Sequence, residues 1–124
     1  MVNPALWSQK ISFPYKEFSE IPLPKDLREC SGLCVSEFGI WSINDSGNEP
    51  YLYLLNEDTT GKESWKTMRY SLPIKNIDWE AVETDNKFIY IGDFGNNKGN
   101  RKDLCIYRIS LQDLIQQSKA TAVK

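Results

Sequence analysis

The sequence predicts an all-β protein built from two copies of one antiparallel repeat, followed by a short helix. Short runs rich in β-branched and aromatic residues alternate with clusters of Gly, Asn, Asp and Pro, which is typical of strands and turns. The segment ending at Asp45-Ser46-Gly47-Asn48 recurs at Asp93-Phe94-Gly95-Asn96. A chain of 124 residues is long enough for one compact domain and too short for two independent ones.

Seven strands are expected in chain order, each separated from the next by a turn cluster. They cover residues 31–36, 40–45, 51–56, 65–72, 79–84, 88–94 and 104–110. A further edge strand is expected over residues 12–21. Apolar residues at helical spacing in residues 111–117 predict a short helix after the last strand.

The two copies align over most of their length. Residues 40–48 match residues 88–96 without a gap, at a constant offset of 48. The next strand, 52–55, matches 106–109 at an offset of 54, because the second copy carries six extra residues around 98–103. Upstream, 29–33 matches 78–82 at an offset of 49, and we assign the one-residue difference to the hairpin turns at 37–39 and 85–87.

A four-stranded repeat with this period is typical of β-propeller blades, since one small sheet buries both faces only when neighbouring blades stack on it. We therefore expect residues 1–124 to form a single partial β-propeller domain. Its parts are an edge strand at 12–21, a blade at 27–75, a second blade at 76–110 and a tail at 111–124. Because a ring needs about four to eight blades, the expected partners are the remaining blades or further copies of the chain.

Composition excludes several classes of function. With 15 basic and 17 acidic residues and a net charge of −2, the chain lacks the basic field of a nucleic-acid-binding protein. No apolar run approaches the length of a membrane span, and the N-terminal residues lack the regions of a signal peptide. Cys30, Cys34 and Cys105 do not have zinc-site spacing, and the chain has no His. Since strand positions four apart share a face, Cys30 and Cys34 are expected to be buried on one face.

Acidic residues stand where the inner strand of each repeat begins. Glu29 takes this place in the first copy, and Asp78 and Glu80 take it in the second. Inner strands line a propeller's axis, where like charges repel unless a cation or proton intervenes. Asp78 and Glu80 alternate onto one strand face, so they are the candidate ligands for a hard cation such as calcium, which prefers six to eight oxygens. The competing interpretation is that these are solvated carboxylates at strand ends.

The recurring loops offer further oxygen ligands, although Asp, Asn and Gly are also what a tight turn selects. Recurrence at one repeat position favours an architectural role in which Asp caps backbone N–H groups, with ligand contact as the alternative. The loop residues concerned are Asn44, Asp45, Asn48, Asp93, Asn96 and Asn97. Basic residues in the adjoining insertion, namely Lys98, Arg101 and Lys102, could receive a phosphate, or could simply be solvated.

Four segments together resemble a family of bacterial propeller proteins related to the SdiA-regulated and esterase-like phytase propellers. The segments are residues 29–33, 41–48, 78–82 and 90–97, and the similarity covers roughly residues 27–110. The resemblance implies a propeller of about six blades, usually exported, with metal binding and a mostly unassigned activity. The chain departs from that pattern in being far shorter and in lacking the His that related propeller lactonases use as a general base.

Three hypotheses about function follow. The first is a binding or scaffold module for a small-molecule ligand, because the residues contain no arrangement of nucleophile and base. The alternative is part of a metal-dependent phosphate or ester hydrolase of phytase-like or lactonase-like type. No motif requires a cofactor, and calcium is the candidate. A third possibility is a truncated gene product with no activity of its own, whose exposed blade edges would promote association.

Overall fold

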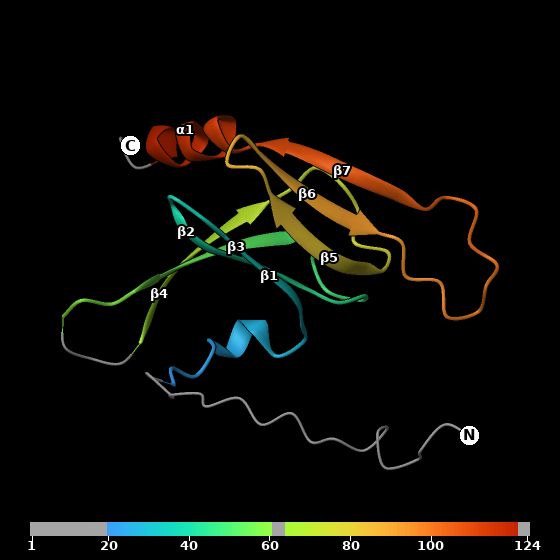
Figure 1. The fold of residues 1–124 in the computed structure, drawn as a ribbon, viewed down its shortest axis with the longest axis horizontal. Coiled ribbons are helices and arrows are strands. Elements are labelled where there is room, and N and C mark those ends of the chain that lie inside the picture. Colours follow the sequence, from blue (N-terminus) through green and yellow to red (C-terminus); the bar gives the residue numbers. More distant parts are fainter. Residues whose placement is uncertain (1–19, 61–63, 122–124) are drawn as a thin grey trace, which may run out of the picture.

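The computed structural model describes residues 20–60 and 64–121 and consists of two antiparallel sheets and a terminal helix (Figure 1). The first sheet has four strands in chain order, β1 (Cys30–Ser36), β2 (Gly39–Asn44), β3 (Tyr51–Glu57) and β4 (Trp65–Ser71). The second has three strands, β5 (Trp79–Thr84), β6 (Phe88–Asp93) and β7 (Cys105–Ser110). A short 3₁₀ helix, η2 (Lys25–Leu27), precedes β1, and α1 (Leu111–Thr121) follows β7.

The predicted all-β class, the seven strands and the terminal helix are confirmed. The predicted edge strand at 12–21 lies outside the described residues except for Glu20 and Ile21, which are not in a strand. Among the described parts of the chain, the second sheet has no fourth strand.

The two hairpin turns are braced in the same way. In the first, Ser36 Oγ accepts a hydrogen bond of 2.8 Å from Trp41 Nε1. In the second, the Asp85 carboxylate accepts one of 2.9 Å from the Tyr90 hydroxyl. Asn86 takes the positive φ of 68° that this turn requires, a conformation that Asn tolerates better than most residues. The two turns therefore have the same length and the same position in the repeat.

Strand pairing corrects the predicted offset of 48. Cys30 pairs with Asn44 and Trp79 with Asp93, and each pair is followed by a bulge at the same position. Equivalent residues of the hairpins are thus 49 apart throughout (30 to 79, 44 to 93). Asn44, rather than Asp45, occupies the place of Asp93. The one-residue difference falls after the second strand of the hairpin, where the loops diverge, and not in the turn.

The third strand confirms the offset of 54. Tyr53 pairs with Ser42 in the first sheet, and Tyr107 pairs with Ile91 in the second. These partners are equivalent residues, so the insertion does lie between the second and third strands of the later copy. Because the offset changes from 49 in the hairpins to 54 in the third strands, the net insertion is five residues rather than the predicted six.

The bulge in β1 also overturns the expected placement of the cysteines. Because the register shifts between Cys30 and Gly32, the alternation of faces is interrupted there. Cys34 packs in the core between the sheets, whereas Cys30 packs against the cluster on the other face, with its Sγ 3.2 Å from Ser42 Oγ. The two residues therefore lie on opposite faces. All three cysteines are free thiols.

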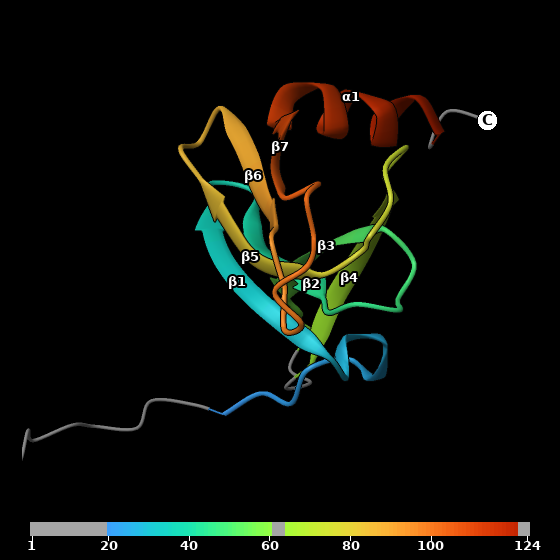
Figure 2. The ribbon, with the colours of Figure 1, turned by 90° about the vertical axis from the view of Figure 1, so that its right-hand side faces the viewer.

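The two sheets pack face to face, with β5 lying along β1 and β2 (Figure 2). The sheets approach each other closely at Gly32, where an added Cβ would lie 3.1 Å from Val82 Cγ1. Large apolar side chains fill the space between the sheets, each stabilising the fold by about 2 kcal/mol through burial. They include Trp41, Ile43, Leu52, Trp79, Ile89 and Ile91.

Helix α1 closes the open end of this core. The backbone N–H of Leu111 donates a hydrogen bond of 3.0 Å to the Lys87 carbonyl, which holds the start of the helix beside the β5–β6 turn. Leu111 and Leu114 are buried in the core between the sheets. Ser110 Oγ accepts a hydrogen bond from the Asp113 N–H, as a helix N-cap does.

Candidate acidic site between the two sheets

Three carboxylates from the two sheets converge at the end of the molecule where the inner strands begin. Oxygen atoms of Asp45, Asp78 and Glu80 all lie within 4.8 Å of one another. Asp45 follows β2, Asp78 precedes β5 and Glu80 belongs to β5. Like charges this close repel one another, and a bound cation would relieve that repulsion.

The strand that carries Glu80 has a bulge at that residue. Trp79 pairs with Asp93 and Ala81 with Gly92, which leaves Glu80 as the extra residue. A bulge redirects the side chains around it, as is frequent beside functional sites. Asp78 is half-buried and Glu80 is exposed.

Asn76 joins the loop of the first sheet to the start of β5. Its Nδ2 donates hydrogen bonds of 3.0 Å to the backbone carbonyls of Asn44 and Asp45. Its Oδ1 accepts one of 3.2 Å from the Trp79 N–H. This clamp sets Asp45 beside Asp78. Sequence reasoning missed Asn76, because an Asn in a linker carries no signal of which distant backbone groups it will bind.

Glu29 lies outside this acidic group, unlike its counterpart Asp78. Its carboxylate accepts a hydrogen bond of 2.6 Å from Asn48 Nδ2, and its carbonyl accepts one of 2.9 Å from the Asp45 N–H. Asn48 Nδ2 also lies 3.0 Å from the Asp45 carbonyl. Glu29 and Asn48 therefore hold the first loop, and the acid that joins Asp78 and Glu80 is Asp45.

Asp93 caps the backbone at the start of β5. Its fully buried carboxylate accepts hydrogen bonds from the Ile77 and Asp78 N–H groups, at 3.3 and 3.0 Å. This is the architectural role expected of the recurring Asp. At the equivalent place in the first copy, Asn44 Nδ2 instead donates to the Asp26 carbonyl at 2.7 Å. The Asp45 carboxylate accepts from the Ser46 N–H beside it, so it does not cap the strand start as Asp93 does.

The insertion in the second copy is folded around Arg101. Its guanidinium forms ion pairs with Asp93 at 2.9 Å and Asp103 at 3.0 Å, and donates to the Gly95 carbonyl at 2.8 Å. Its backbone N–H donates to Asn96 Oδ1 at 3.0 Å. The hydrogen bond from Arg101 lowers the pKa of the Asp103 carboxyl. Arg101 Nη2 is buried and has no hydrogen-bond partner among the described residues, whereas the lysines of the insertion, Lys98 and Lys102, are exposed.

A small hollow of about 230 Å³ adjoins the acidic group on the side of this insertion. A Cβ on Gly95 would overlap the Asp78 carboxylate, so only glycine allows the loop to approach so closely. Asn97, predicted as a loop ligand, is exposed at the hollow. The lining residues are Asp78, Gly95, Asn96, Asn97, Lys98, Asn100 and Arg101.

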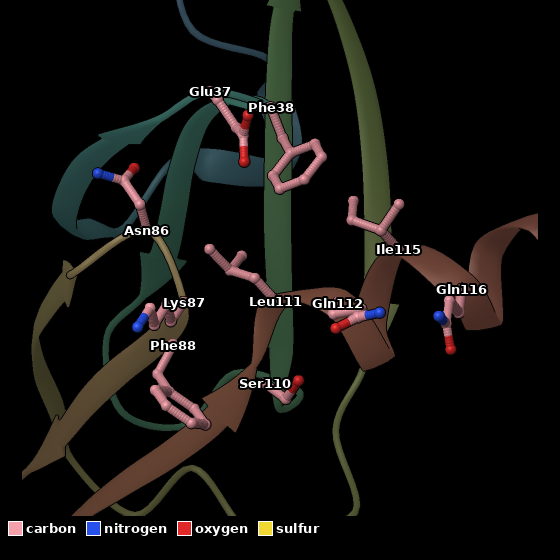
Figure 3. A pocket seen from close by; sticks show the side chains of 10 residues that line it. All are labelled: Glu37, Phe38, Asn86, Lys87, Phe88, Ser110, Leu111, Gln112, Ile115 and Gln116. Carbon is pink, nitrogen blue, oxygen red and sulfur yellow. The ribbon is translucent and has the colours of Figure 1, made fainter.

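A larger groove of about 640 Å³ lies at the opposite end of the hairpins, between their turns and α1 (Figure 3). Phe38, Leu111 and Ile115 supply its apolar lining, and Glu37 and Lys87 supply charge. None of the residues predicted as ligands lines it. The groove is therefore separate from the acidic group.

Comparison of the chain with protein-family models, curated proteins and solved structures found no match. Within residues 20–60 and 64–121, neither helix has the length and apolar character of a membrane span.

Proposed function

We propose that the chain is a β-propeller-like binding module whose ligand is a hard divalent cation such as calcium, bound at Asp45, Asp78 and Glu80. The observation that carries the proposal is the convergence of carboxylate oxygens from two different sheets within 4.8 Å. The predicted pair Asp78 and Glu80 thereby gains a third acid.

Electrostatics favour a cation here. Two unit charges about 4 Å apart near a protein surface repel by about 4 kcal/mol, and a divalent ion reverses the sign of that interaction. Calcium takes oxygen ligands from carboxylates, amide carbonyls and water, all of which this end of the molecule can supply. Because the acids come from both sheets, a cation bound by the folded state would also stabilise the packing of one sheet on the other.

The wider setting is the bacterial, exported propeller that the sequence resembles. Two face-packed antiparallel sheets with equivalent register support that arrangement. In it, the remaining blades or further copies of the chain complete the structure. A small-molecule ligand would then bind where the inner strands begin, beside the cation.

Calorimetric titration with calcium chloride tests the cation site. We expect a dissociation constant between about 1 μM and 1 mM, the range of sensor and extracellular sites. Asp45→Asn and Glu80→Gln should each weaken binding about tenfold or more. Glu37→Gln removes an exposed carboxylate at the opposite, turn end of the first hairpin and should leave binding unchanged. Absence of binding below millimolar calcium, or equal affinity in all three variants, would reject the site.

A hydrolase of phosphate or ester substrates is the second candidate, favoured by Lys98, which lines the same hollow as Asp78. A cation and a lysine on either side of the hollow would hold an anionic group between them. Calcium-dependent hydrolysis of p-nitrophenyl phosphate or p-nitrophenyl acetate, lost in Asp78→Asn, would support this function. Calcium binding without turnover of either compound would reject the hydrolase and support the binding module.

A further inference from the structure

The register of the two sheets shows that residues on the inner face of the first sheet have their equivalents on the outer face of the second. The face of the first sheet that packs on β5 carries Trp41 and Leu52, both fully buried. Their equivalents in the second sheet are Tyr90 and Ile106, which point away from the first sheet. Ile106 is 65% exposed. The second sheet thus presents to solvent the face that the first sheet buries.

In the same way, residues on the inner face of the second sheet have their equivalents on the outer face of the first. Val82 of β5 faces the first sheet, where it meets Gly32. The residue equivalent to Val82 is Leu33, which lies on the outer face of β1 and is 53% exposed. Beside it on that face, Val35 is 70% exposed. The first sheet therefore presents the face that the second sheet buries.

We infer that copies of this chain associate head to tail, with the free face of the second sheet of one copy packed on the free face of β1 of the next. This contact repeats, between copies, the packing already present within one copy. The inference rests on the blade arrangement of the proposed function and is independent of the cation.

Coverage of the first sheet fits this contact. Leu27, from η2, is buried together with Tyr53 and Leu55 of β3, so β3 is already covered on that face. The inner strand is not covered, as the exposure of Leu33 and Val35 shows. Within one copy the sheets meet chiefly through β1 and β5. The exposed outer face of β1 is therefore the surface on which the second sheet of another copy would pack.

The chemistry of the second free face sets the strength of the contact. Tyr90 and Ile106 keep the aromatic and apolar character of their buried equivalents, whereas Glu83 and Arg108 stand where the first sheet has Cys34 and Leu54. Charges in place of apolar groups make an interface wetter and weaker. We therefore expect a reversible association that depends on protein concentration.

A head-to-tail contact uses two different surfaces, so it can be distinguished from a two-fold symmetric one by mixing variants. Val35→Glu disables the β1 face and Ile106→Glu disables the face of the second sheet. Both side chains are largely exposed, so neither change should unfold the chain. Each variant alone should be monomeric. Their equimolar mixture should form a 1:1 dimer and no larger species, because each contributes one intact face.

Sedimentation velocity of the full chain from about 5 to 500 μM, a range suited to weak interfaces, provides the measurement. The average mass of the wild type should rise across this range. Met68→Glu is the matched control: Met68 is 44% exposed but lies opposite Leu54, on the face already used within the copy, so association should persist. Circular dichroism verifies folding, and Leu33→Ser with Ile106→Ser forms a milder second pair if either Glu variant unfolds.

Three results would overturn the inference. They are a wild type that stays monomeric throughout, association abolished by only one of the two Glu variants, or association that neither abolishes because it runs through the unpaired edge of β7. A failed calcium titration leaves this inference standing, and a monomeric wild type leaves the calcium site standing.

Discussion

The guanidinium of Arg101 lies 2.9 Å from the carboxylate of Asp93, which is fully buried. Asp93 caps the start of β5, and Arg101 belongs to the insertion that distinguishes the second copy from the first. The insertion thus supplies the countercharge for the residue that positions Asp78. The insertion is therefore linked to the acidic group through the Arg101–Asp93 ion pair and the hydrogen bond from the Asp78 N–H to Asp93.

Arg101→Ala should lower the free energy of unfolding by about 3 kcal/mol, because a buried carboxylate would lose its ion-pair partner. Urea unfolding followed by tryptophan fluorescence measures this change. Lys98→Ala, an exposed cation in the same loop, should change stability by less than about 0.5 kcal/mol. Equal stability of the two variants would show that the Arg101–Asp93 pair contributes nothing to the fold.

Gly32→Val should destabilise the packing of the two sheets by about 2 kcal/mol, the usual cost of overfilling a packed core. An added Cβ already lies 3.1 Å from Val82 Cγ1. In the Val82→Ala background the same substitution should cost less, since the opposing methyl groups are gone. A double-mutant cycle by chemical denaturation gives the coupling. Additive effects would place the two residues out of contact.

Cys34 should resist thiol reagents in the folded protein. Burial raises the pKa of its thiol from 9.0 to about 11, and the nearby Glu83 carboxylate acts in the same direction. The thiolate is the reactive form, so labelling with dithionitrobenzoate at pH 8 should be slow when Cys30 and Cys105 are replaced by Ser, and fast in urea. Rapid labelling of the folded variant would contradict the burial of Cys34.

The same shift predicts a loss of stability in alkali. Between pH 9.0 and about 11 the folded state retains the Cys34 proton that the unfolded state releases, so stability falls as pH rises through this window. Cys34→Ala should remove that part of the pH dependence, and its denaturant midpoint should fall less steeply over the same range.

The second hairpin should be sensitive to acid. Hydrogen bonds from the Phe88 and Lys87 N–H groups, and then from the Tyr90 hydroxyl, lower the pKa of Asp85 below 3.8. The stability this carboxylate contributes is present above pH 3.8 and is lost as pH falls through its folded-state pKa. Titration of the Asp85 carboxyl by NMR checks the shift, and Tyr90→Phe should raise the pKa. A pKa at or above 3.8 in the wild type would refute the bracing of this turn.

Much of the local structure could be predicted because it depends on neighbouring residues. Alternation of apolar residues and the turn chemistry of Asn86 were sufficient to predict the hairpins, and helical spacing predicted α1. The offset of 48 was wrong because it was fixed by the identical Asp-x-Gly-Asn residues in the loops. The offset of the hairpin strands is 49, and only the cross-strand pairing reveals it. Cys30 was misplaced for a related reason, since a bulge interrupts alternation without any marker in the sequence.

The recurring Asp-x-Gly-Asn loops show the same division. By itself the sequence determined that two such loops exist, that each follows a hairpin, and that Asp78 and Glu80 stand at the start of a strand. Only the tertiary structure decided that Asp93 is a buried cap paired with Arg101, while Asp45 joins the acids of the neighbouring sheet. Identical residues took different roles because a carboxylate's partners are set by which sheets pack together and by where an insertion folds, and both depend on contacts distant in the chain.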